Sequence, residues 1–301
     1  MIMIRKKIAT IFISFTFPLA TLWGLPLRVV TTSTDLASIA QIVGGDRVHA
    51  ESLTPPDTDL HYVQARPDYI LKVSRADVFI EIGLDLEIAW APAILRQSRN
   101  AKVSKGSKGF CDASTGIRIL EKPTGKVTRR MGDIHIYGNP HYWTDPVNGI
   151  IMAGTIRDCL TRVDPAGKSV YQKNYNQLKN QLKQITIEYL KKLKPFFGTQ
   201  VVAYHNEFVY FTKRFRLNIA DYIEEKPGVP PGPGRIRKIS EFIRKNHIRV
   251  ILATPWSNLV YCRKVANNTG AKLLILPIET RSDYPTMLRT VLEELWKALK
   301  S

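Results

Sequence analysis

A long segment without a helix breaker divides this 301-residue chain into two parts. From residue 166 to residue 194 the segment is rich in Gln, Lys and Leu, and its one glycine is its second residue. Leu178, Leu182, Ile185 and Tyr189 recur at spacings of three and four, which is the period of one helix face. The pattern predicts one helix of unusual length for a compact domain. We interpret it as a rigid strut between two domains.

Strand-like and helix-like patterns alternate on both sides of this segment. The predicted strands are 27–32, 48–53, 77–82, 200–204, 219–223, 250–253 and 272–276, with weaker strands near Ile117 and Val127. The predicted helices are 34–43, 67–75, 84–97, 146–162, 207–215, 235–246, 259–268 and 284–299. This rhythm predicts an α/β fold with two lobes, each a mostly parallel sheet flanked by helices. We place the lobes at 25–164 and 196–301, and the linking helix at 165–195.

The first residues have the composition of an export signal. Arg5, Lys6 and Lys7 precede an apolar run over 8–22, which contains one proline and no charge. The run is short for a membrane span, so we expect a signal peptide over 1–24 and a periplasmic protein; an uncleaved anchor is the alternative. Because no cysteine follows the run closely, we expect no lipid anchor.

Charge and cysteine content limit the other classes of function. The formal charge is +18, but the basic residues are scattered and form no known nucleic-acid-binding motif, so we expect no nucleic-acid partner. Cys111, Cys159 and Cys262 lack the C-x-x-C spacing of zinc sites. Export makes a disulfide possible, and the sequence leaves the pair open.

Three of the six histidines lie at or beyond the ends of predicted strands. These are His61, His141 and His205, and Glu279 follows the last predicted strand. Ligands of open α/β sheets bind at the carboxyl ends of strands, so these side chains could converge between the lobes. Neutral imidazoles with one carboxylate suit zinc. Their wide spacing in the sequence does not by itself establish a site.

Several motifs resemble those of the metal-binding solute-binding proteins of ATP-binding-cassette (ABC) importers, the zinc- and manganese-uptake family. The resemblance covers nearly the whole chain after the signal. Its motifs are Asp59-Leu60-His61-Tyr62 with Arg66-Pro67-Asp68, Ala76-Asp77-Val78-Phe79 with Gly83, Glu87 and Trp90, Asn139-Pro140-His141-Tyr142-Trp143-Thr144-Asp145-Pro146, and Tyr204-His205-Asn206-Glu207-Phe208. Leu60 stands where the family usually has proline.

The resemblance implies a ligand set of His61, His141, His205 and Glu279. Asp283 or a water molecule is the alternative for the fourth position. The family's His-rich loop is absent, since the region 121–138 has one histidine, His135. The long helix of the family implies little movement between the lobes when metal binds.

Outer contacts of the ligands follow from general rules. A ligating histidine usually donates its second N–H to a carboxylate or a carbonyl group. Asp59 and Asp145 are candidates for such acceptors, and a helix cap or a loop brace is the alternative role for each.

The resulting interpretation is an extracytoplasmic protein without catalytic activity. It would bind a divalent transition metal, zinc in preference to manganese or iron, and deliver it as a monomer to the permease of an ABC importer. A zinc hydrolase is one alternative, because three histidines and a water also form catalytic sites. The sequence offers no positioned general base or nucleophile elbow for it. A surface adhesin is the other alternative.

Overall fold

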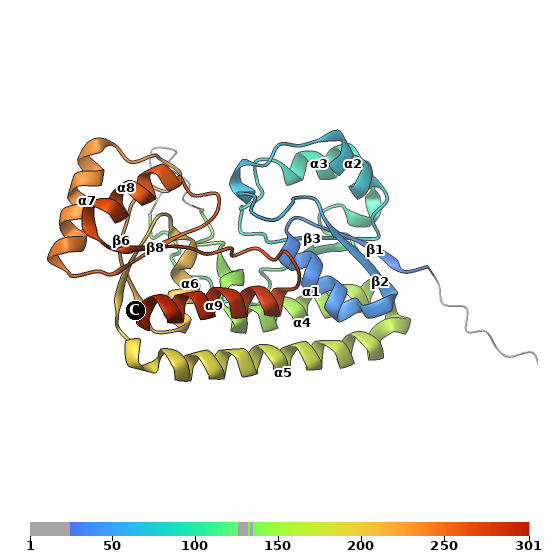
Figure 1. The fold of residues 1–301 in the computed structure, drawn as a ribbon. Coiled ribbons are helices and arrows are strands. Elements are labelled where there is room, and N and C mark those ends of the chain that lie inside the picture. The colour runs from blue at the N-terminus through green and yellow to red at the C-terminus, as the bar shows by residue number, and fades with distance from the viewer. Residues whose placement is uncertain (1–24, 126–131, 133–134, 301) are drawn as a thin grey trace, which may run out of the picture.

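The computed structural model describes residues 25–125, 132 and 135–300. Two α/β lobes lie side by side above one long helix, α5 (Figure 1). The predicted signal peptide and Val127, near which a weak strand was predicted, lie outside the described residues. Within the described residues, no helix has the length and apolar character needed to cross a bilayer.

The first lobe is built on a parallel sheet with the strand order β2-β1-β3-β4. Its strands are β1 (Leu27–Thr31), β2 (Val48–Ser52), β3 (Val78–Glu81) and β4 (Phe110–Asp112). Its helices are α1 (Thr34–Gly44), α2 (Pro67–Ser74), α3 (Ala91–Ser98) and α4 (Pro146–Val163). The strands β1 and β3 at the centre of the sheet are largely buried, as expected for a parallel sheet with covered faces.

Two predictions for this lobe were wrong. The helix predicted at 84–97 begins only at Ala91, because Leu84 and Asp85 have the left-handed φ values of 55° and 65°. The fourth strand lies at Phe110–Asp112 rather than near Ile117. Three residues are too few to display the alternation by which a strand is recognised in a sequence.

The second lobe repeats the same topology. Its parallel sheet has the order β6-β5-β7-β8. Its strands are β5 (Gln200–Ala203), β6 (Asn218–Tyr222), β7 (Val250–Ala253) and β8 (Lys272–Ile275). Its helices are α6 (Val209–Arg214), α7 (Pro233–Lys245), α8 (Leu259–Thr269) and α9 (Tyr284–Lys300). The predicted two-lobe α/β class is therefore confirmed.

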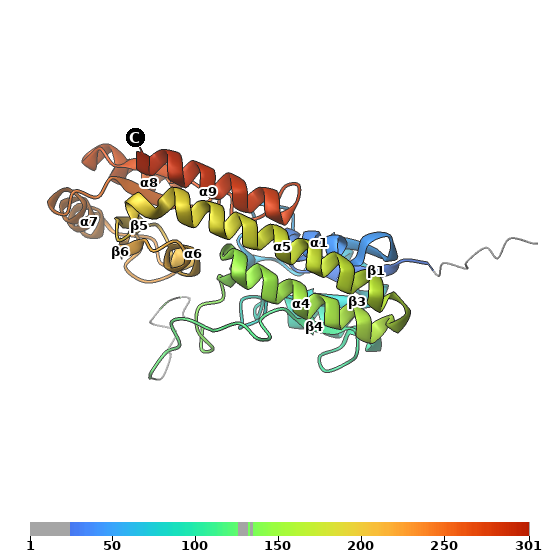
Figure 2. The same cartoon turned by 90° about the horizontal axis from the view of Figure 1, so that it is seen from below.

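The predicted strut is the helix α5, Lys168–Leu193. Its 26 residues correspond to a length of about 39 Å at 1.5 Å per residue. It lies beside α4 and α9 under both lobes (Figure 2). Arg289 of α9 pairs with Glu188 of α5 at 2.7 Å, and Tyr189 of α5 donates to Glu293 of α9 at 3.0 Å. The strut is thus packed against its neighbours along its length.

One continuous hydrophobic core joins the lobes, and a smaller one lies within the second lobe. The larger core includes Val29 of β1, Leu182 of α5 and Phe211 of α6. The smaller core lies between the second sheet and the helices α7 and α8, and includes Ile239 and Val265. The first lobe and the base of the second therefore share apolar packing, while the outer part of the second lobe has its own.

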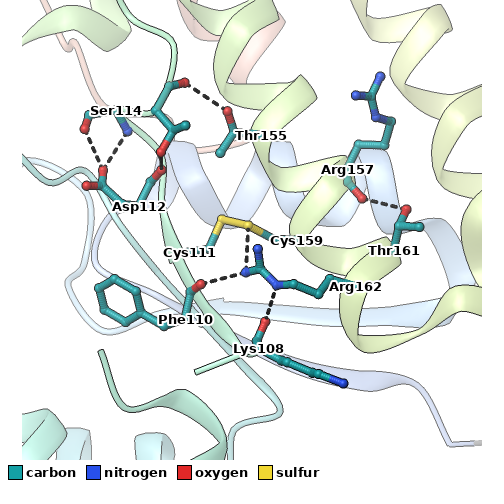
Figure 3. Close-up of a disulfide and its surroundings, with 11 residues drawn as sticks. Lys108, Phe110, Cys111, Asp112, Ser114, Thr155, Arg157, Cys159, Thr161 and Arg162 are labelled. Atoms are coloured by element: carbon teal, nitrogen blue, oxygen red, sulfur yellow. Dashed lines mark hydrogen bonds between the residues drawn. A yellow bond between two sulfur atoms is a disulfide. The ribbon is translucent and has the colours of Figure 1, made fainter. Parts of the chain in front are cut away.

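A disulfide reinforces the first lobe. Cys111 of β4 and Cys159 of α4 form the bond, with a Cα–Cα distance of 6.1 Å (Figure 3). Arg162, one turn further along α4, donates to the carbonyl groups of Lys108 and Phe110 at 2.8 Å. Cys262 is a buried free cysteine in the second lobe. The disulfide therefore ties the short edge strand to the helix that covers it.

Candidate metal centre

The structure brings the three predicted histidines together from three separate segments. His61 lies in the short 3-10 helix Leu60–Tyr62 after β2, His141 precedes α4, and His205 directly follows β5. One nitrogen from each ring can be chosen so that all three lie within 4.8 Å of one another. The ring centroids are 5.2 to 5.8 Å apart. Such a spacing requires little further movement to bind one ion.

Each of these imidazoles has its Nδ1 atom bound to an oxygen acceptor. Asp59 accepts from His61 at 2.7 Å and Glu224 accepts from His205 at 2.8 Å. The third acceptor is the side-chain oxygen of Asn139, 3.0 Å from Nδ1 of His141. With the proton held on Nδ1, the Nε2 lone pair of each ring is available to a metal.

A short local motif orients the two histidines of the first lobe. The Oδ1 atom of Asp59 also accepts the backbone N–H of His61 at 3.0 Å, and Asn139 does the same for His141 at 2.9 Å. An Asp or Asn two residues before the histidine therefore fixes both the backbone and the ring. The predicted contact of Asp59 with His61 is present.

The other predicted acceptor, Asp145, has a different role. It caps α4 by accepting from the backbone N–H of Val147 at 2.8 Å, and it pairs with Arg214 at 2.8 Å. The helix-cap alternative therefore describes Asp145. The acceptor for His205 is Glu224, which follows the neighbouring strand β6 and which the sequence analysis did not single out.

The predicted carboxylate Glu279 lies beside the cluster but is outside the 4.8 Å group. It is buried and lines a small cavity with His61, His141 and Trp143. One of its oxygens accepts from the backbone N–H of Thr58 at 3.4 Å. The alternative, Asp283, caps α9 by accepting from the N–H of Thr286 at 2.9 Å.

A second buried carboxylate, Glu207, lines the same cavity. It belongs to the motif Tyr204-His205-Asn206-Glu207-Phe208, but it was not among the predicted ligands. Trp256 donates to its Oε1 atom at 2.5 Å. Glu207 also lines a larger cavity of about 370 Å³, whose wall includes Asp59, His205 and Glu224. Its position two residues after His205 was the available sequence signal.

Three buried polar atoms of this cleft have no hydrogen-bond partner among the described residues. They are Nε2 of His205, Oε2 of Glu207 and Oε1 of Glu279. A buried polar atom without a partner costs about 1–3 kcal/mol. Nε2 of His205 belongs to the three-histidine group, so a cation bound by that group would satisfy this atom, and the donor set fits a metal.

Electrostatics keep part of the cluster in its metal-binding form. Burial and the neighbouring His61 and His205 hold the pKa of His141 well below its usual value, so this ring is neutral. Burial would also lower the pKa of His205, but the hydrogen bond to Glu224 and the nearby Glu207 raise it above the usual value. Burial and the proximity of Asp35 raise the pKa of Glu279 well above its normal range.

Several curated proteins are similar in sequence to this chain. ScbA of Streptococcus cristatus, a metal ABC transporter substrate-binding lipoprotein, is 28% identical over 224 residues, which are 74% of this chain and 70% of ScbA. The iron-binding protein YfeA of Yersinia pestis is 26% identical over 250 residues, 81% of this chain and 75% of YfeA. The manganese ABC transporter substrate-binding lipoprotein PsaA of Streptococcus pneumoniae is 26% identical over 266 residues, 81% of this chain and 80% of PsaA.

Solved structures share the fold. The crystal structure of ZnuA superposes with a TM-score of 0.78 at 21% identity, covering 91% of this chain and 99% of ZnuA. The laminin-binding adhesin Lmb of Streptococcus agalactiae, at 26% identity, gives a TM-score of 0.76 with coverage of 91% and 99%. The family model described as zinc-uptake complex component A, periplasmic, matches residues 29–298. The chain therefore belongs to this family of metal-binding solute-binding proteins of ABC importers, and not to a family of enzymes.

Proposed function

We propose that the chain captures a divalent transition metal, with zinc preferred, in the cleft between its lobes. The ligands would be His61, His141 and His205, with Glu279 as the fourth. The observation that carries this proposal is the convergence of three imidazoles, each with Nδ1 already bound to an oxygen acceptor. Such outer contacts are typical of ligating histidines.

The donor set supports zinc over manganese. Imidazole nitrogen binds zinc well, whereas manganese prefers carboxylate, carbonyl and water oxygens. The Irving–Williams order also places zinc above manganese and iron(II) for a site of this kind. The curated relatives are named for manganese and iron as well as for metal in general, so the preference needs a direct measurement.

The direct test is titration of the metal-free protein, without residues 1–24, with zinc and with manganese. His141→Ala should weaken zinc binding at least about 100-fold, which is about 2.7 kcal/mol. The matched control is His49→Ala, because His49 is exposed on β2. If a folded His141→Ala protein retained the zinc affinity of the His49→Ala control, the proposed ligand set would be wrong. Tighter binding of manganese than of zinc would refute the preference.

The chain would deliver its metal, as a monomer, to the membrane permease of an ABC importer. It would do so as a periplasmic protein with a cleaved signal and no lipid, even though several relatives are called lipoproteins. The sequence supports this difference, because its cysteines are at 111, 159 and 262. Mass spectrometry of the exported protein tests the expected N-terminus, and a lipid modification there would contradict the proposal. Light scattering tests the monomeric state, and a dimer would contradict it.

An adhesin role is the second candidate. The observation in its favour is the similarity to Lmb, which is described as a laminin-binding adhesin. The net positive charge would assist binding to anionic matrix. Salt-sensitive binding to laminin that survives His141→Ala would support this role, and the absence of binding would exclude it.

A further inference from the structure

A fourth histidine contacts the three-histidine cluster. The Nε2 atom of His135 lies 3.1 Å from Nε2 of His61. The His135 ring centroid is 5.2 Å from that of His61 and 6.4 Å from that of His141. We propose that His135 is a further metal-binding imidazole of this site, which binds the ion jointly with His61. This inference rests on the proposed metal-binding function.

The directions of the lone pairs carry the argument. Nδ1 of His61 is held by Asp59 at 2.7 Å, so the proton of a neutral His61 lies on that side. Its Nε2 lone pair therefore points toward Nε2 of His135. Two imidazole nitrogens at 3.1 Å need a proton or a metal ion between them. In a tetrahedral zinc site with Zn–N bonds of about 2.0–2.1 Å, donor nitrogens lie roughly 3.3 Å apart, so the observed separation suits a shared ion.

The environment of His135 favours a ligand. The His135 side chain is half-buried in the loop that precedes His141. Its ring also forms a hydrogen bond with the backbone of Asp85. A half-buried ring that is anchored in this way differs from a freely solvated loop histidine.

The local sequence repeats the motif of the other two first-lobe histidines. Asp133-Ile134-His135 has the spacing of Asp59-Leu60-His61 and of Asn139-Pro140-His141. Asp133 itself lies outside the described residues. In the two described cases the residue two positions earlier fixes the histidine ring.

A fourth imidazole would determine which metal is preferred. His135, like Glu279, lies outside the 4.8 Å group. In this inference His135 takes the fourth ligand position in place of Glu279. Glu279 lines the cavity beside His141 and Trp143, whereas His135 contacts His61. An additional nitrogen donor favours zinc, while a carboxylate is acceptable to manganese as well. His135 would therefore be a specificity-determining residue.

X-ray absorption spectroscopy on the zinc-loaded protein without residues 1–24 tests this assignment. The imidazole scattering should correspond to four histidines in the unmodified protein and to three in His135→Ala. In competition titrations His135→Ala should lower zinc affinity by roughly tenfold or more, that is by at least about 1.4 kcal/mol. Its manganese affinity should change less. His135→Gln, which retains a polar side chain of similar size, guards against misfolding, and His49→Ala is the matched control.

The possible outcomes are distinct. Three imidazoles in the unmodified protein, together with unchanged zinc affinity in both His135 variants, would overturn the inference and leave the proposed function intact. Failure of the unmodified protein to bind zinc, manganese or iron would instead remove the proposed function. A selective loss of zinc affinity with one imidazole fewer would establish His135 as a ligand.

Discussion

The two sheets have equivalent strand orders, β2-β1-β3-β4 and β6-β5-β7-β8, but the lobes are stabilised differently. The first has a disulfide and shares its core with the linking helices. The outer part of the second has a separate small core and a free buried cysteine. The same strand order thus occurs in two lobes that are stabilised by different contacts. The first lobe, which is cross-linked and shares the larger core, holds His61 and His141, and the second lobe, whose outer part has its own core, holds His205.

Glu279 modifies this comparison. It follows a strand of the second lobe, yet its segment is held by the first. Asp35 of α1 accepts from the backbone N–H of Thr280 at 3.1 Å, and Trp143 donates to the carbonyl of Ile278 at 2.8 Å. Glu279 is therefore positioned by the first lobe. Opening of the lobes would separate His205 from the remaining candidate ligands.

The largest expected difference between the lobes concerns the disulfide. Replacing both cysteines, Cys111→Ala with Cys159→Ala, should lower the free energy of unfolding by up to about 4 kcal/mol, given a sequence separation of 48 residues. Cys262→Ala is the control in the other lobe, and it should cost only about 1 kcal/mol. Urea denaturation followed by fluorescence measures both. Equal losses would mean that the lobes do not differ in this respect.

The next largest effect is expected from the hydrogen bonds that Glu224 and Asn139 accept from the histidine rings. Glu224→Ala and Asn139→Ala each leave one histidine ring without its acceptor, so zinc affinity should fall roughly 10- to 100-fold in each variant. Glu224→Ala should have the larger effect, because a carboxylate stabilises a metal-bound imidazole more than an amide does. Calorimetric titration measures the two values. A smaller effect from Glu224→Ala would reverse the expected order.

The pH dependence should be dominated by the second lobe. The pKa of His205 is raised, while that of His141 is well below its usual value, so a proton competes with the metal more strongly at His205 than at His141. Zinc affinity should therefore fall as the pH drops through the pKa of His205. Glu224→Gln removes a contribution that raises this pKa, so the decline should move to lower pH. An unchanged pH profile of affinity would show that another group controls it.

A smaller effect is expected where the first lobe holds the Glu279 segment. The Oγ atom of Ser38 accepts from the backbone N–H of Tyr284 at 2.9 Å, so Ser38→Ala should cost about 1 kcal/mol of stability. Zinc affinity should fall by only a few-fold. Ser74→Ala is the control, since Ser74 donates to the Leu71 carbonyl in an exposed turn of α2. Identical melting temperatures of the Ser38→Ala and Ser74→Ala proteins would show that the hydrogen bond between Ser38 and Tyr284 does not stabilise the protein.

The smallest change is expected in overall shape. The strut α5 and the shared core limit rotation between the lobes. X-ray scattering profiles of metal-free and zinc-loaded protein should therefore nearly superimpose. A large change in the radius of gyration would show that the smaller core of the second lobe moves as a separate unit.

Most of the fold could be predicted because periodicity is a local property. The long helix and seven of the eight strands followed from spacing alone, whereas β4 is too short to show a period. The convergence of His61, His141 and His205 depended on resemblance, because no spacing relates residues so far apart. The Glu224 contact was missed because it comes from a neighbouring strand 19 residues away. His135 was not among the predicted ligands, because a single histidine in the region 121–138 carries no spacing signal, and its contact with His61 depends on the folding of the loop.

The tripeptides Asp59-Leu60-His61 and Asn139-Pro140-His141 share one pattern, Asx-x-His, which could be transferred to other proteins. Its side-chain oxygen accepts both the backbone N–H and the Nδ1–H of the histidine, so one local contact favours the tautomer with a free Nε2 atom. A protein engineer could place such a tripeptide on a loop of an unrelated scaffold and obtain a preset ligand. Only the distances between several tripeptides would then remain to be designed.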